Sequence, residues 1–430
     1  MNVLILSTTE LDAKNASGNT YANFFSQWEN TKFACVYARS SYPDNDFCDE
    51  YYRITISGII KNFFTPWRIG DRFAKRDIQQ LTLQKNNVEK KIEKKYRGKR
   101  NFLYLIYDFL YYLSFWKNKK YKDFIKDFKP DIVFFSAKSD AFYYENLKYI
   151  KKYTQARIVA FYTDDVFGGY VNNKGLVRKI FARRFPKIVG FADFHYGASL
   201  LMCESYGKLF DIKIKPLYKG CEISDPSVSL NNPIKMVYAG NLFYGRDEVL
   251  CLVAKALENI NQKFIKIILE IYTGSSVPPD IEATLNNKEF TKIVGQKPYC
   301  EIKKILHSAD IVLHVESFKQ MYIDKVKLSY STKISDCLQS GSMLLVVGPK
   351  GVSSVEESLS IEGSCVITEP SCIEEELNRM LLDKSLILSN AKKTNNYAKE
   401  KFPLDLVRRD LKNDFLNLCC ENPQKMKTQK

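Results

Sequence analysis

Short apolar runs that alternate with segments of helical length are the feature that most constrains the fold of this chain. The first half contains NVLIL, FACVYAR, DIVFFSA, RIVAFYTD and DFHYGAS, and the second half contains IKMVYAG, DIVLHVE and MLLVVGP. Runs that are almost continuously β-branched or aromatic are typical of strands buried on both faces, and the helical lengths between them are typical of crossover connections. The pattern predicts an α/β protein in which each half forms its own doubly wound, Rossmann-like sheet.

A polar segment separates the two sets of runs. Residues 221–233 are rich in Ser, Asn, Asp and Pro and show no periodicity, and new strand-like runs begin directly after them. The sequence therefore predicts an N-terminal domain over residues 1–222 and a C-terminal domain over residues 233–395. Apolar residues at helical spacing predict a closing helix over residues 396–420 that packs back on the first domain, and we expect residues 421–430 to be disordered.

Composition is that of a globular protein with sizeable cores. The 430 residues are 45% hydrophobic and 27% charged. No apolar run reaches the ~18 residues of a transmembrane helix, and the N-terminal strand lacks a basic leader, so neither a membrane span nor a signal peptide is expected. The 11 Cys are scattered, which indicates reduced thiols and a cytoplasmic location, and the three His are spread too widely to favour a metal site.

Positive charge is concentrated in the first half of the chain. Of a net charge of +16, residues 1–222 carry +15, with 38 Lys and Arg against 23 Asp and Glu. A polyanion or an anionic membrane surface should therefore meet that half. Within it, residues 85–100 hold eight basic and two acidic side chains, and residues 101–116 are dense in aromatics. These two segments fit either a solvated helix followed by a buried one or a peripheral membrane contact, since sixteen residues are too few to span a bilayer.

Two loops of the second half have the composition of a phosphate site. Ser331 and Thr332 are residue types that begin helices, and Lys333 adds a positive charge at the same place. In VYAGNLFYGRDEVL, Gly240 would let the backbone approach a ligand closely, and Arg246 could form a fork to a diphosphate. Both features have a structural alternative. Ser331 could cap a helix without binding a ligand, and Arg246 could lie in solvent.

Together these segments resemble the GT-B glycosyltransferases, in particular the broad retaining group, glycosyl transferases group 1, that builds bacterial capsules and O-antigens. The resemblance covers nearly the whole chain and rests on the order of YAGN…R, VGQKPYCEIKKILHSADIVLHVESF and STKISDCLQSGSMLLVVGP. It implies two domains that face each other across a cleft. It also implies transfer of a hexose from a nucleotide-diphosphate donor to a glycan or lipid-linked acceptor in surface polysaccharide synthesis. No cofactor or metal is implied, and the implied location is cytoplasmic, on the inner face of the membrane if the protein is peripheral.

The resemblance also implies roles for single residues. Arg246 resembles the basic residue on the donor diphosphate, and residues 331–333 match the stretch that faces the phosphates. Glu316 and Asp336 resemble acids that contact sugar or ribose hydroxyls. The expected donor-binding residues are Gly18, Asn19, Gly240, Asn241, Arg246, Gly295, Gln296, Glu316, Ser331, Thr332, Lys333 and Asp336.

Two candidate features lie in the first half. Asp164 and Asp165 end a strand-like run before a Gly-rich turn, as a paired acid does in similar sequences. Carboxylates at such an edge could orient or deprotonate an acceptor hydroxyl, or they could form a turn or cap a helix. Gly18 is expected just before a helix, in the loop that approaches the donor phosphates in this family, although Asn19 could instead cap that helix.

The chain departs from the family pattern in one respect. Many members have two Glu eight positions apart, the second at the position of Asp336, whereas here position 328 is Leu and the upstream Glu is Glu316. The donor sugar and the stereochemical outcome therefore stay open.

Two rival functions also stay open. One is a nucleotide-sugar 2-epimerase on the same fold, although three scattered His are few for that chemistry. The other is a non-catalytic protein that binds nucleic acid or an assembly complex. Only residues 85–116 match a nucleic-acid surface, so we expect no nucleic-acid partner.

Overall fold

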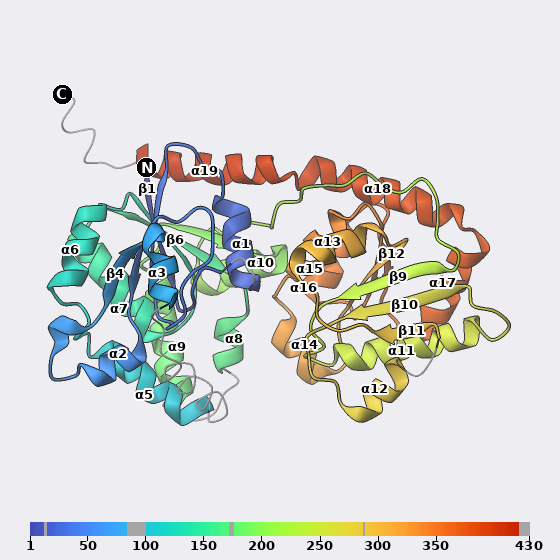
Figure 1. The fold of residues 1–430 in the computed structure, drawn as a ribbon, viewed down its shortest axis with the longest axis horizontal. Helices are drawn as coiled ribbons and strands as arrows, with labels where there is room; N and C mark the ends of the chain where they lie inside the picture. The colour runs from blue at the N-terminus through green and yellow to red at the C-terminus, as the bar shows by residue number, and fades with distance from the viewer. Residues whose placement is uncertain (13–14, 84–99, 172–175, 287–288, 421–430) are drawn as a thin grey trace. The chain divides into compact units, whose positions relative to one another are not determined.

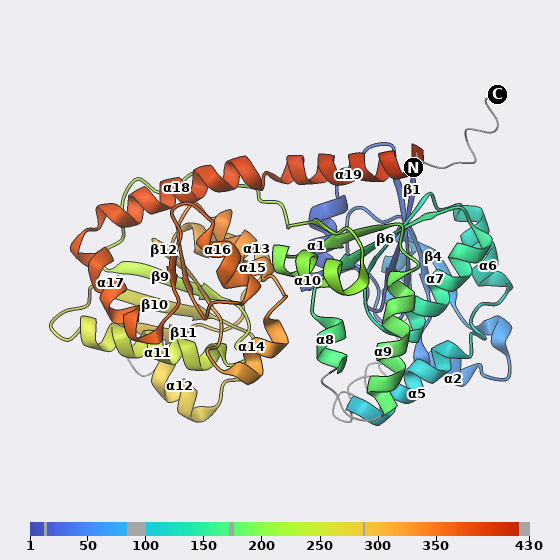
Figure 2. The same cartoon turned by 180° about the vertical axis from the view of Figure 1, so that it is seen from behind.

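The chain forms two compact units, each with its own sheet. The structure is a computed structural model that describes residues 1–12, 15–83, 100–171, 176–286 and 289–420. Unit 1 comprises Met1–Gly197, Cys203–Pro216 and the chain from Arg408, and unit 2 comprises Ala198–Met202 and Leu217–Val407. Figure 1 and Figure 2 show from opposite sides that helices cover both faces of each sheet. The prediction of two doubly wound, Rossmann-like α/β sheets is confirmed.

Unit 1 is built on an eight-stranded sheet with the order β4-β3-β2-β1-β5-β6-β7-β8. Its strands are β1 (Asn2–Ser7), β2 (Lys32–Tyr37), β3 (Glu50–Arg53), β4 (Asp71–Ala74), β5 (Ile132–Ser136), β6 (Arg157–Tyr162), β7 (Phe194–Gly197) and β8 (Lys215–Pro216). All neighbours are parallel except β3 and β4. The apolar runs predicted β1, β2, β5, β6 and β7, whereas β3 and β4 escaped prediction because four-residue strands with charged ends carry little apolar pattern.

The helices of unit 1 follow the same local rules. They are α1 (Ala16–Phe25), α2 (Ile56–Lys61), α3 (Ile78–Leu83), α5 (Arg100–Tyr112), α6 (Lys119–Phe128), α7 (Ala141–Tyr153), α8 (Val166–Val171), α9 (Leu176–Val189) and α10 (Leu200–Phe210), with short turns η1 (Pro66–Arg68) and η2 (Lys75–Asp77). In α6, Tyr121, Phe124, Ile125 and Phe128 share one face and are buried. Asn118 caps this helix by accepting a hydrogen bond from the amide of Tyr121.

Unit 2 is built on a six-stranded parallel sheet with the order β11-β10-β9-β12-β13-β14. Its strands are β9 (Ile234–Ala239), β10 (Ile267–Tyr272), β11 (Thr291–Ile293), β12 (Ile311–Val315), β13 (Met343–Val347) and β14 (Cys365–Ile367). Its helices are α11 (Arg246–Ile260), α12 (Pro279–Leu285), α13 (Tyr299–His307), α14 (Gln320–Val326), α15 (Thr332–Leu338), α16 (Ser353–Leu359), α17 (Ile373–Leu382) and α18 (Ser385–Lys401), with the turn η3 (Pro370–Cys372). The order places β9 and β12 side by side at the point where the chain changes direction across the sheet.

The segment expected as a domain boundary lies on unit 2. The chain passes from unit 1 to unit 2 after Pro216, before the polar segment 221–233 begins. The amide of Ser224 donates to the carbonyl oxygen of Gln339, and the amide side chain of Asn395 donates to the carbonyl oxygen of Ser224. Residues 221–233 lack periodic hydrophobicity because they form no long helix or strand, and they pack against unit 2 rather than linking the two units.

The closing segment is two helices and not the single helix predicted over residues 396–420. α18 ends at Lys401, and α19 (Leu404–Cys420) begins after Pro403, which has no amide hydrogen with which to continue the first helix. From Arg408 onward α19 belongs to unit 1. Phe415 is fully buried there, with its ring 5.6 Å from that of Trp28 and 6.0 Å from that of Phe134.

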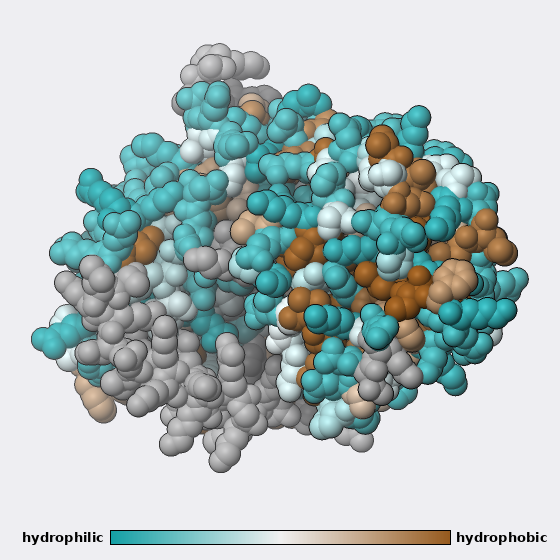
Figure 3. All heavy atoms as spheres, turned by 45° about the vertical axis from the view of Figure 1, so that its right-hand side comes forward, coloured by the Kyte–Doolittle hydropathy of each residue, from teal (hydrophilic) through white to brown (hydrophobic). Residues whose placement is uncertain are grey.

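The surface is mixed in character. Within the described ranges, no helix combines the length and hydrophobicity needed to cross a bilayer. The face in Figure 3 is covered largely by hydrophilic side chains, with hydrophobic ones gathered in small patches. Residues 85–99 of the predicted basic segment and residues 421–430 lie outside the described part of the chain. The aromatic segment that follows is only partly buried, because Tyr111 and Trp116 face the core whereas Phe109 and Tyr112 are exposed.

The contacts of α19 generate a stability prediction. Replacing Phe415 by Ala should destabilise unit 1 by about 3–5 kcal/mol, because the cavity would lie among aromatic side chains that cannot collapse into it. Leu416→Ala, at an exposed position of the same helix, should change the free energy of unfolding by less than about 0.5 kcal/mol. Thermal and urea unfolding followed by tryptophan fluorescence would measure both, and equal effects would contradict the packing described.

Candidate functional site

Charged side chains meet in unit 2 at the carboxyl ends of β9 and β12. The two strands are paired in parallel, with Met236 opposite Ile311, while β10 and β13 extend the sheet to opposite sides. Loops from such neighbours diverge, and the crevice between them is where open α/β sheets bind ligands. The residues gathered here are Gly240, Asn241, Arg246, His314, Glu316 and Lys333, which we call the switch-point cluster.

Arg246 is the first residue of α11 and is buried rather than solvated. Its Nη2 donates to both carboxylate oxygens of Glu316, at 3.0 Å each, and its Nη1 donates to Oδ1 of Asn241 at 3.0 Å. Gly245, with φ of 73°, adopts the left-handed conformation that turns the chain into the helix. The buried Nε of Arg246 has no hydrogen-bond partner in the described part of the chain. One guanidinium nitrogen therefore contacts a protein carboxylate, and the expected fork to a diphosphate stays a prediction.

Glu316 holds Arg246 from the end of β12. Its carboxylate is almost fully buried. One of its oxygens also accepts a hydrogen bond from Nε2 of His314 at 3.0 Å. Burial alone would raise the pKa of Glu316, but the hydrogen bond from His314 and the charge of Arg246 outweigh it and hold that pKa at about 2. Both oxygens are thus engaged inside the protein, which differs from the direct contact with sugar or ribose hydroxyls that we expected.

Lys333 brings a second cation to the cluster. Its side chain lies against the space that Gly240 leaves open, where a Cβ would collide with the ammonium, and it passes 5.5 Å from the ring centre of Tyr238. The ammonium is buried and makes no hydrogen bond to any described residue. Burial, and next the charge of Arg246, lower the pKa of Lys333 to about 7. A buried cation without a counter-ion is costly, so this position has the properties of a site built for an anion.

Asp336 lies on the same helix as Lys333 but belongs to a separate group. Its Oδ1 accepts hydrogen bonds from Nζ of Lys219 at 2.6 Å and from the hydroxyl of Tyr299 at 2.8 Å. Lys219 also lies over the ring of Tyr299, 5.1 Å from its centre. Burial lowers the pKa of Lys219, but the charge of Asp336 outweighs this and raises it overall. Asp336 is thus paired with a cation, whereas Lys333 on the same helix has no anion as a partner among the described residues. The expected role of Asp336 toward sugar hydroxyls stays a prediction.

The two hydroxyl residues before Lys333 contribute little to the cluster. Ser331 precedes α15 but makes no side-chain capping hydrogen bond, and its own amide donates to Oγ of Ser354 at 2.9 Å. Thr332 is the first residue of this seven-residue helix. The cation at Lys333, rather than these hydroxyls, distinguishes this end of the helix.

Gly295 and Gln296 lie apart from the cluster, in the loop after β11. Gly295 has φ of 98°, with open space where a Cβ would be. Gln296 is exposed, and its amide packs where a Cβ on Gly274 would lie. β11 is two strands from β9, which corresponds to roughly 10 Å. Their expected place beside a nucleotide base stays a prediction.

In unit 1, the paired acids after β6 have different surroundings. The carboxylate of Asp165 accepts from the amide of Gly168 at 2.8 Å and from the hydroxyl of Tyr206 at 2.9 Å, so it caps the first turn of α8. Asp164 is exposed, with Thr163 Oγ1 at 3.5 Å from its carboxylate. The capping alternative therefore applies to Asp165, and Asp164 is the acid that faces solvent at this edge of the sheet.

The prediction that Gly18 stands just before a helix is wrong. α1 begins at Ala16 and is capped by Asn15, whose side chain accepts from the amide of Gly18 at 2.7 Å, so neither Asn19 nor Thr20 is the cap. A Cβ at Gly18 would collide with the backbone of Asp12. Gly18 is needed because the backbone of Asp12 packs closely against the helix at this point. The sequence alone could not identify the cap, since several Asn, Ser and Thr residues in this short polar stretch are equally good capping residues.

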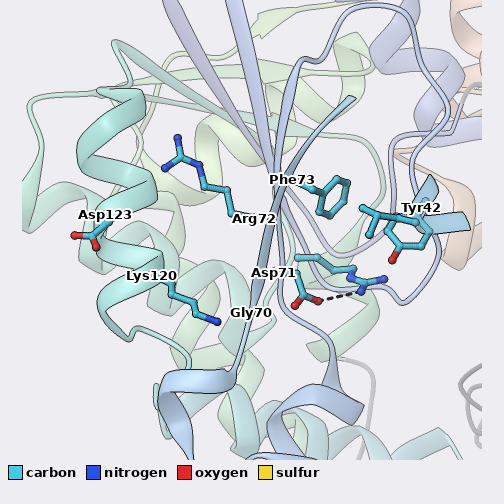
Figure 4. A pocket seen from close by; sticks show the side chains of 9 residues that line it. Tyr42, Gly70, Asp71, Arg72, Phe73, Lys120 and Asp123 are labelled. Carbon is cyan, nitrogen blue, oxygen red and sulfur yellow. Dashed lines mark hydrogen bonds and ion pairs between the residues drawn. The ribbon is translucent and has the colours of Figure 1, made fainter. Parts of the chain in front are cut away.

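A cavity of about 570 Å³ lies elsewhere in unit 1 and contains none of the predicted residues. It opens at the carboxyl end of β3 and along β4, where Figure 4 shows Arg72 and Phe73 pointing to opposite sides of the strand. Arg53 pairs with Asp71 at 2.9 Å and lies over the ring of Tyr42. β3 is four strands from β6, or roughly 19 Å, so this cavity is distinct from the edge that carries Asp164.

Comparison with known proteins identifies the fold. No protein-family model and no curated protein matches the sequence. Among solved structures, the chain is similar to Anabaena HepE in complex with UDP and glucose, at a TM-score of 0.62 and 9% identity over 97% of this chain and 100% of that one. It is also similar to sucrose-phosphate synthase from Thermosynechococcus elongatus, with a TM-score of 0.62 and 10% identity over 97% and 99% of the two chains. A third similar structure is an Escherichia coli trehalose-6-phosphate protein bound with UDP-2-fluoro glucose, with a TM-score of 0.59 and 10% identity over 96% and 99%.

These neighbours are GT-B glycosyltransferases, so the chain has the GT-B fold, as the sequence resemblance implied. At this level of identity the likeness concerns the fold alone. The ligands in these structures, UDP with glucose and a UDP sugar, are bound to HepE and to the Escherichia coli protein respectively.

Two residues, His314 in the switch-point cluster and Lys219 beside Asp336, were not predicted from the sequence. His314 stands two residues before Glu316, and strand periodicity places such positions on one face, so this signal could have been used. Lys219 carries no comparable signal, because it is one of 65 basic residues and lies far from Asp336 in sequence.

The unpaired ammonium predicts an unusual pH dependence of stability. The pKa of Lys333 is about 7 in the folded protein against 10.5 for an ordinary lysine, so between these pH values the unfolded chain holds a proton that the folded protein lacks. Stability should therefore rise as pH increases from about 7 toward 10. Lys333→Met should lose this rise and gain about 1–3 kcal/mol near neutral pH.

Lys219→Met is the matched control, since it removes a buried ammonium that has a counter-ion. It should destabilise the protein by about 3–5 kcal/mol because Asp336 would stay buried without its partner. Urea unfolding across this pH range measures both variants, and a stabilised Lys219→Met or a destabilised Lys333→Met would contradict the assignment.

Proposed function

We propose that this protein is a glycosyltransferase that moves a sugar from a nucleotide-diphosphate donor to a glycan or lipid-linked acceptor. The observation that carries the proposal is the pair of buried cations, Arg246 and Lys333, at the carboxyl ends of β9 and β12, where Lys333 lacks a counter-ion. The ligands of two structural neighbours, UDP with glucose and a UDP sugar, support a donor of this kind.

A diphosphate has the negative charge that the ammonium of Lys333 lacks as a partner in the part of the chain that the structure describes. Its oxygens could accept from the ammonium of Lys333 and from the unpartnered Nε of Arg246, both of which are buried donors without acceptors. The missing side chain of Gly240 lets the ammonium of Lys333 pack directly against the backbone at the end of β9, which holds the positive charge at that point. Binding would return the pKa of Lys333 toward its ordinary value, so the anion would relieve strain already present in the protein.

The proposed reaction exchanges one bond at the anomeric carbon of the sugar for another. The bond to the diphosphate oxygen breaks with its electron pair moving to the diphosphate, and the acceptor hydroxyl oxygen forms the new bond as its proton leaves. Lys333 and Arg246 would stabilise the negative charge that develops on the leaving diphosphate. Glu316 and His314 are positioning residues, because Glu316 accepts hydrogen bonds from the guanidinium of Arg246 and His314 is hydrogen-bonded to Glu316.

We assign the acceptor proton to Asp164, which is exposed at the carboxyl end of β6, whereas Asp165 is engaged in capping α8. A carboxylate at such an edge can accept the proton of an incoming hydroxyl. The sequence resemblance supports the finer proposal of a retaining hexosyltransferase in bacterial surface polysaccharide synthesis, with Asp336, Gly295 and Gln296 contributing to the donor site and no metal required.

Donor binding is tested by a thermal-shift screen. UDP, GDP and ADP sugars at about millimolar concentration should include one that raises the melting temperature by several degrees, since a ligand stabilises the folded state by mass action. CMP sugars, which have a single phosphate, should shift it less. Lys333→Met should abolish the shift while remaining at least as stable as the wild type without ligand. The donor assignment fails if no nucleotide sugar stabilises the wild type, or if Lys333→Met responds equally.

The assignment of the acids is tested by exchanging each for its amide. Asp164→Asn should lower the transfer rate by about 10²–10⁴-fold with donor binding unchanged, since only the proton acceptor is lost. Asp165→Asn should instead keep a transfer rate close to that of the wild type, because an Asn side-chain oxygen also accepts the hydrogen bonds from Gly168 and Tyr206. Nucleotide release from the donor identified above, with a membrane lipid extract as acceptor source, measures the rate. If Asp164→Asn keeps full activity, another group takes the proton, and conversion of the donor sugar without acceptor would favour an epimerase.

A further inference from the structure

Unit 1 exposes a group of large apolar side chains on the neighbouring segments of α2, η1 and α5. The exposed side chains are Ile60, Phe63, Phe64, Trp67, Phe109, Tyr112 and Phe115, which we call the aromatic surface. Phe64 is 89% exposed and Trp67 is 61% exposed. Isolated exposed apolar residues are ordinary, whereas a contiguous group rich in Phe, Trp and Tyr marks an interaction site.

The members of the aromatic surface lie together in space. Figure 1 and Figure 2 both show α2 beside α5, and the two helices pack against each other. The ring centre of Phe63 lies 5.3 Å from that of Phe64 and 5.4 Å from that of Phe115. The hydroxyl of Tyr111, on the buried side of α5, donates to the carbonyl oxygen of Ile54 just before α2.

The loop that carries Phe64 and Trp67 is held in place by its own contacts. Ile69 is fully buried, and the side-chain amide of Asn118 donates to the carbonyl oxygens of Pro66 and Ile69, at 2.8 and 2.7 Å. The amide of Arg68 also donates to the carbonyl oxygen of Thr65. The two aromatic side chains are therefore presented to the outside by an ordered loop with buried anchors.

The charge around the aromatic surface is mostly positive, and the nearest acid after the loop, Asp71, is paired with Arg53. Lys61, Arg68, Lys119 and Lys120 are exposed, while residues 54–70 and 109–122 contain no Asp or Glu. Figure 4 shows Lys120 pointing toward Gly70, at the end of the loop that carries Trp67. A second copy of the chain docking through the same surface would bring these cations against their equivalents, which disfavours self-association.

We propose that the aromatic surface docks on an anionic lipid bilayer, with Phe64 and Trp67 entering the interface and the surrounding lysines and arginine contacting lipid phosphates. Aromatic side chains favour the boundary between headgroups and acyl chains, and basic side chains beside them favour anionic lipids. No helix among the described residues could span the bilayer, so the contact is peripheral. This proposal does not depend on the transfer reaction. It differs from the sequence-based expectation by placing α2 and η1, rather than residues 85–99, at its centre.

The protein contains its own reporter for this contact. Its three tryptophans are Trp28, Trp67 and Trp116, and their exposed fractions are 8%, 61% and 0%. The emission of Trp67 should therefore shift to shorter wavelength when the full-length protein meets vesicles of phosphatidylcholine with about one third phosphatidylglycerol. Brominated acyl chains should quench it, and the spectra of Trp28 and Trp116 should stay unchanged.

Vesicle co-sedimentation supplies the quantitative test. Phe64→Ser with Trp67→Ser should weaken binding by more than about tenfold, and Lys61→Glu with Arg68→Glu should weaken binding to anionic vesicles about fivefold per side chain, or more. Val228→Ser with Leu382→Ser, which removes two equally exposed apolar side chains from unit 2, should leave binding unchanged. Melting temperatures of all three variants establish that they are folded.

Three results would overturn the proposal. Equal binding by the Phe64/Trp67 and Val228/Leu382 variants would show that the aromatic surface is not the contact. Binding without any change in Trp67 emission would show that the rings do not enter the interface. A concentration-dependent dimer that the Phe64/Trp67 variant abolishes, without vesicle binding by the wild type, would assign the surface to a second copy of the chain.

Discussion

The ion pair between Arg246 and Glu316 is the interaction on which the geometry of the candidate site depends. It joins the start of α11 to the end of β12 through hydrogen bonds of 3.0 Å between almost fully buried groups. Two charges in such a place are held out of water, so each is tolerated only while the other is present. The pair therefore fixes the direction of the guanidinium, and with it the position at which a ligand at the ends of β9 and β12 would meet positive charge.

The buried, unpaired ammonium of Lys333 is the feature of this cluster that a purely structural role does not explain. A protein that needed only stability would leave this ammonium in solvent or give it a carboxylate, as it does for Lys219 and Asp336. Here the charge with the largest effect on the pKa of the ammonium is another cation, Arg246, and the ammonium has no hydrogen-bond partner among the described residues. Functional sites commonly keep such unfavourable local arrangements because a ligand removes them on binding. The contrast between Lys219, which is paired with Asp336 of α15, and Lys333 of α15, which is not paired with any described residue, is the observation that supports the proposed binding role of Lys333.

The two units divide the proposed work between them. The second unit holds nearly all of the predicted donor residues and carries almost no net charge, so its cations act by position and burial rather than by number. The first unit carries the basic excess and the aromatic surface, and both suit a partner that is extended and anionic. A transferase that takes its acceptor from a bilayer would need a surface of this kind, whichever sugar it transfers.

The sequence by itself determined most of the strands, their order and the two-unit division, because the periodicity of buried strands and helices is a local property of the chain. It did not predict β3 and β4, whose short segments carry little apolar pattern. The sequence also placed Gly240, Arg246 and Lys333 at the right edge of the right sheet, since residues that follow parallel strands always meet at one edge.

Only the tertiary structure decided which groups are paired. Glu316 holds Arg246 and Lys219 satisfies Asp336, and each of these pairs joins residues that are distant along the chain. The cap by Asp165 and the contact of Gly18 with Asp12 are local, but the sequence allowed several alternatives at both places and only the structure shows which one forms. The exposure of Phe64 and Trp67 is of the same kind, because aromatic residues in a sequence indicate a core unless the fold turns them outward.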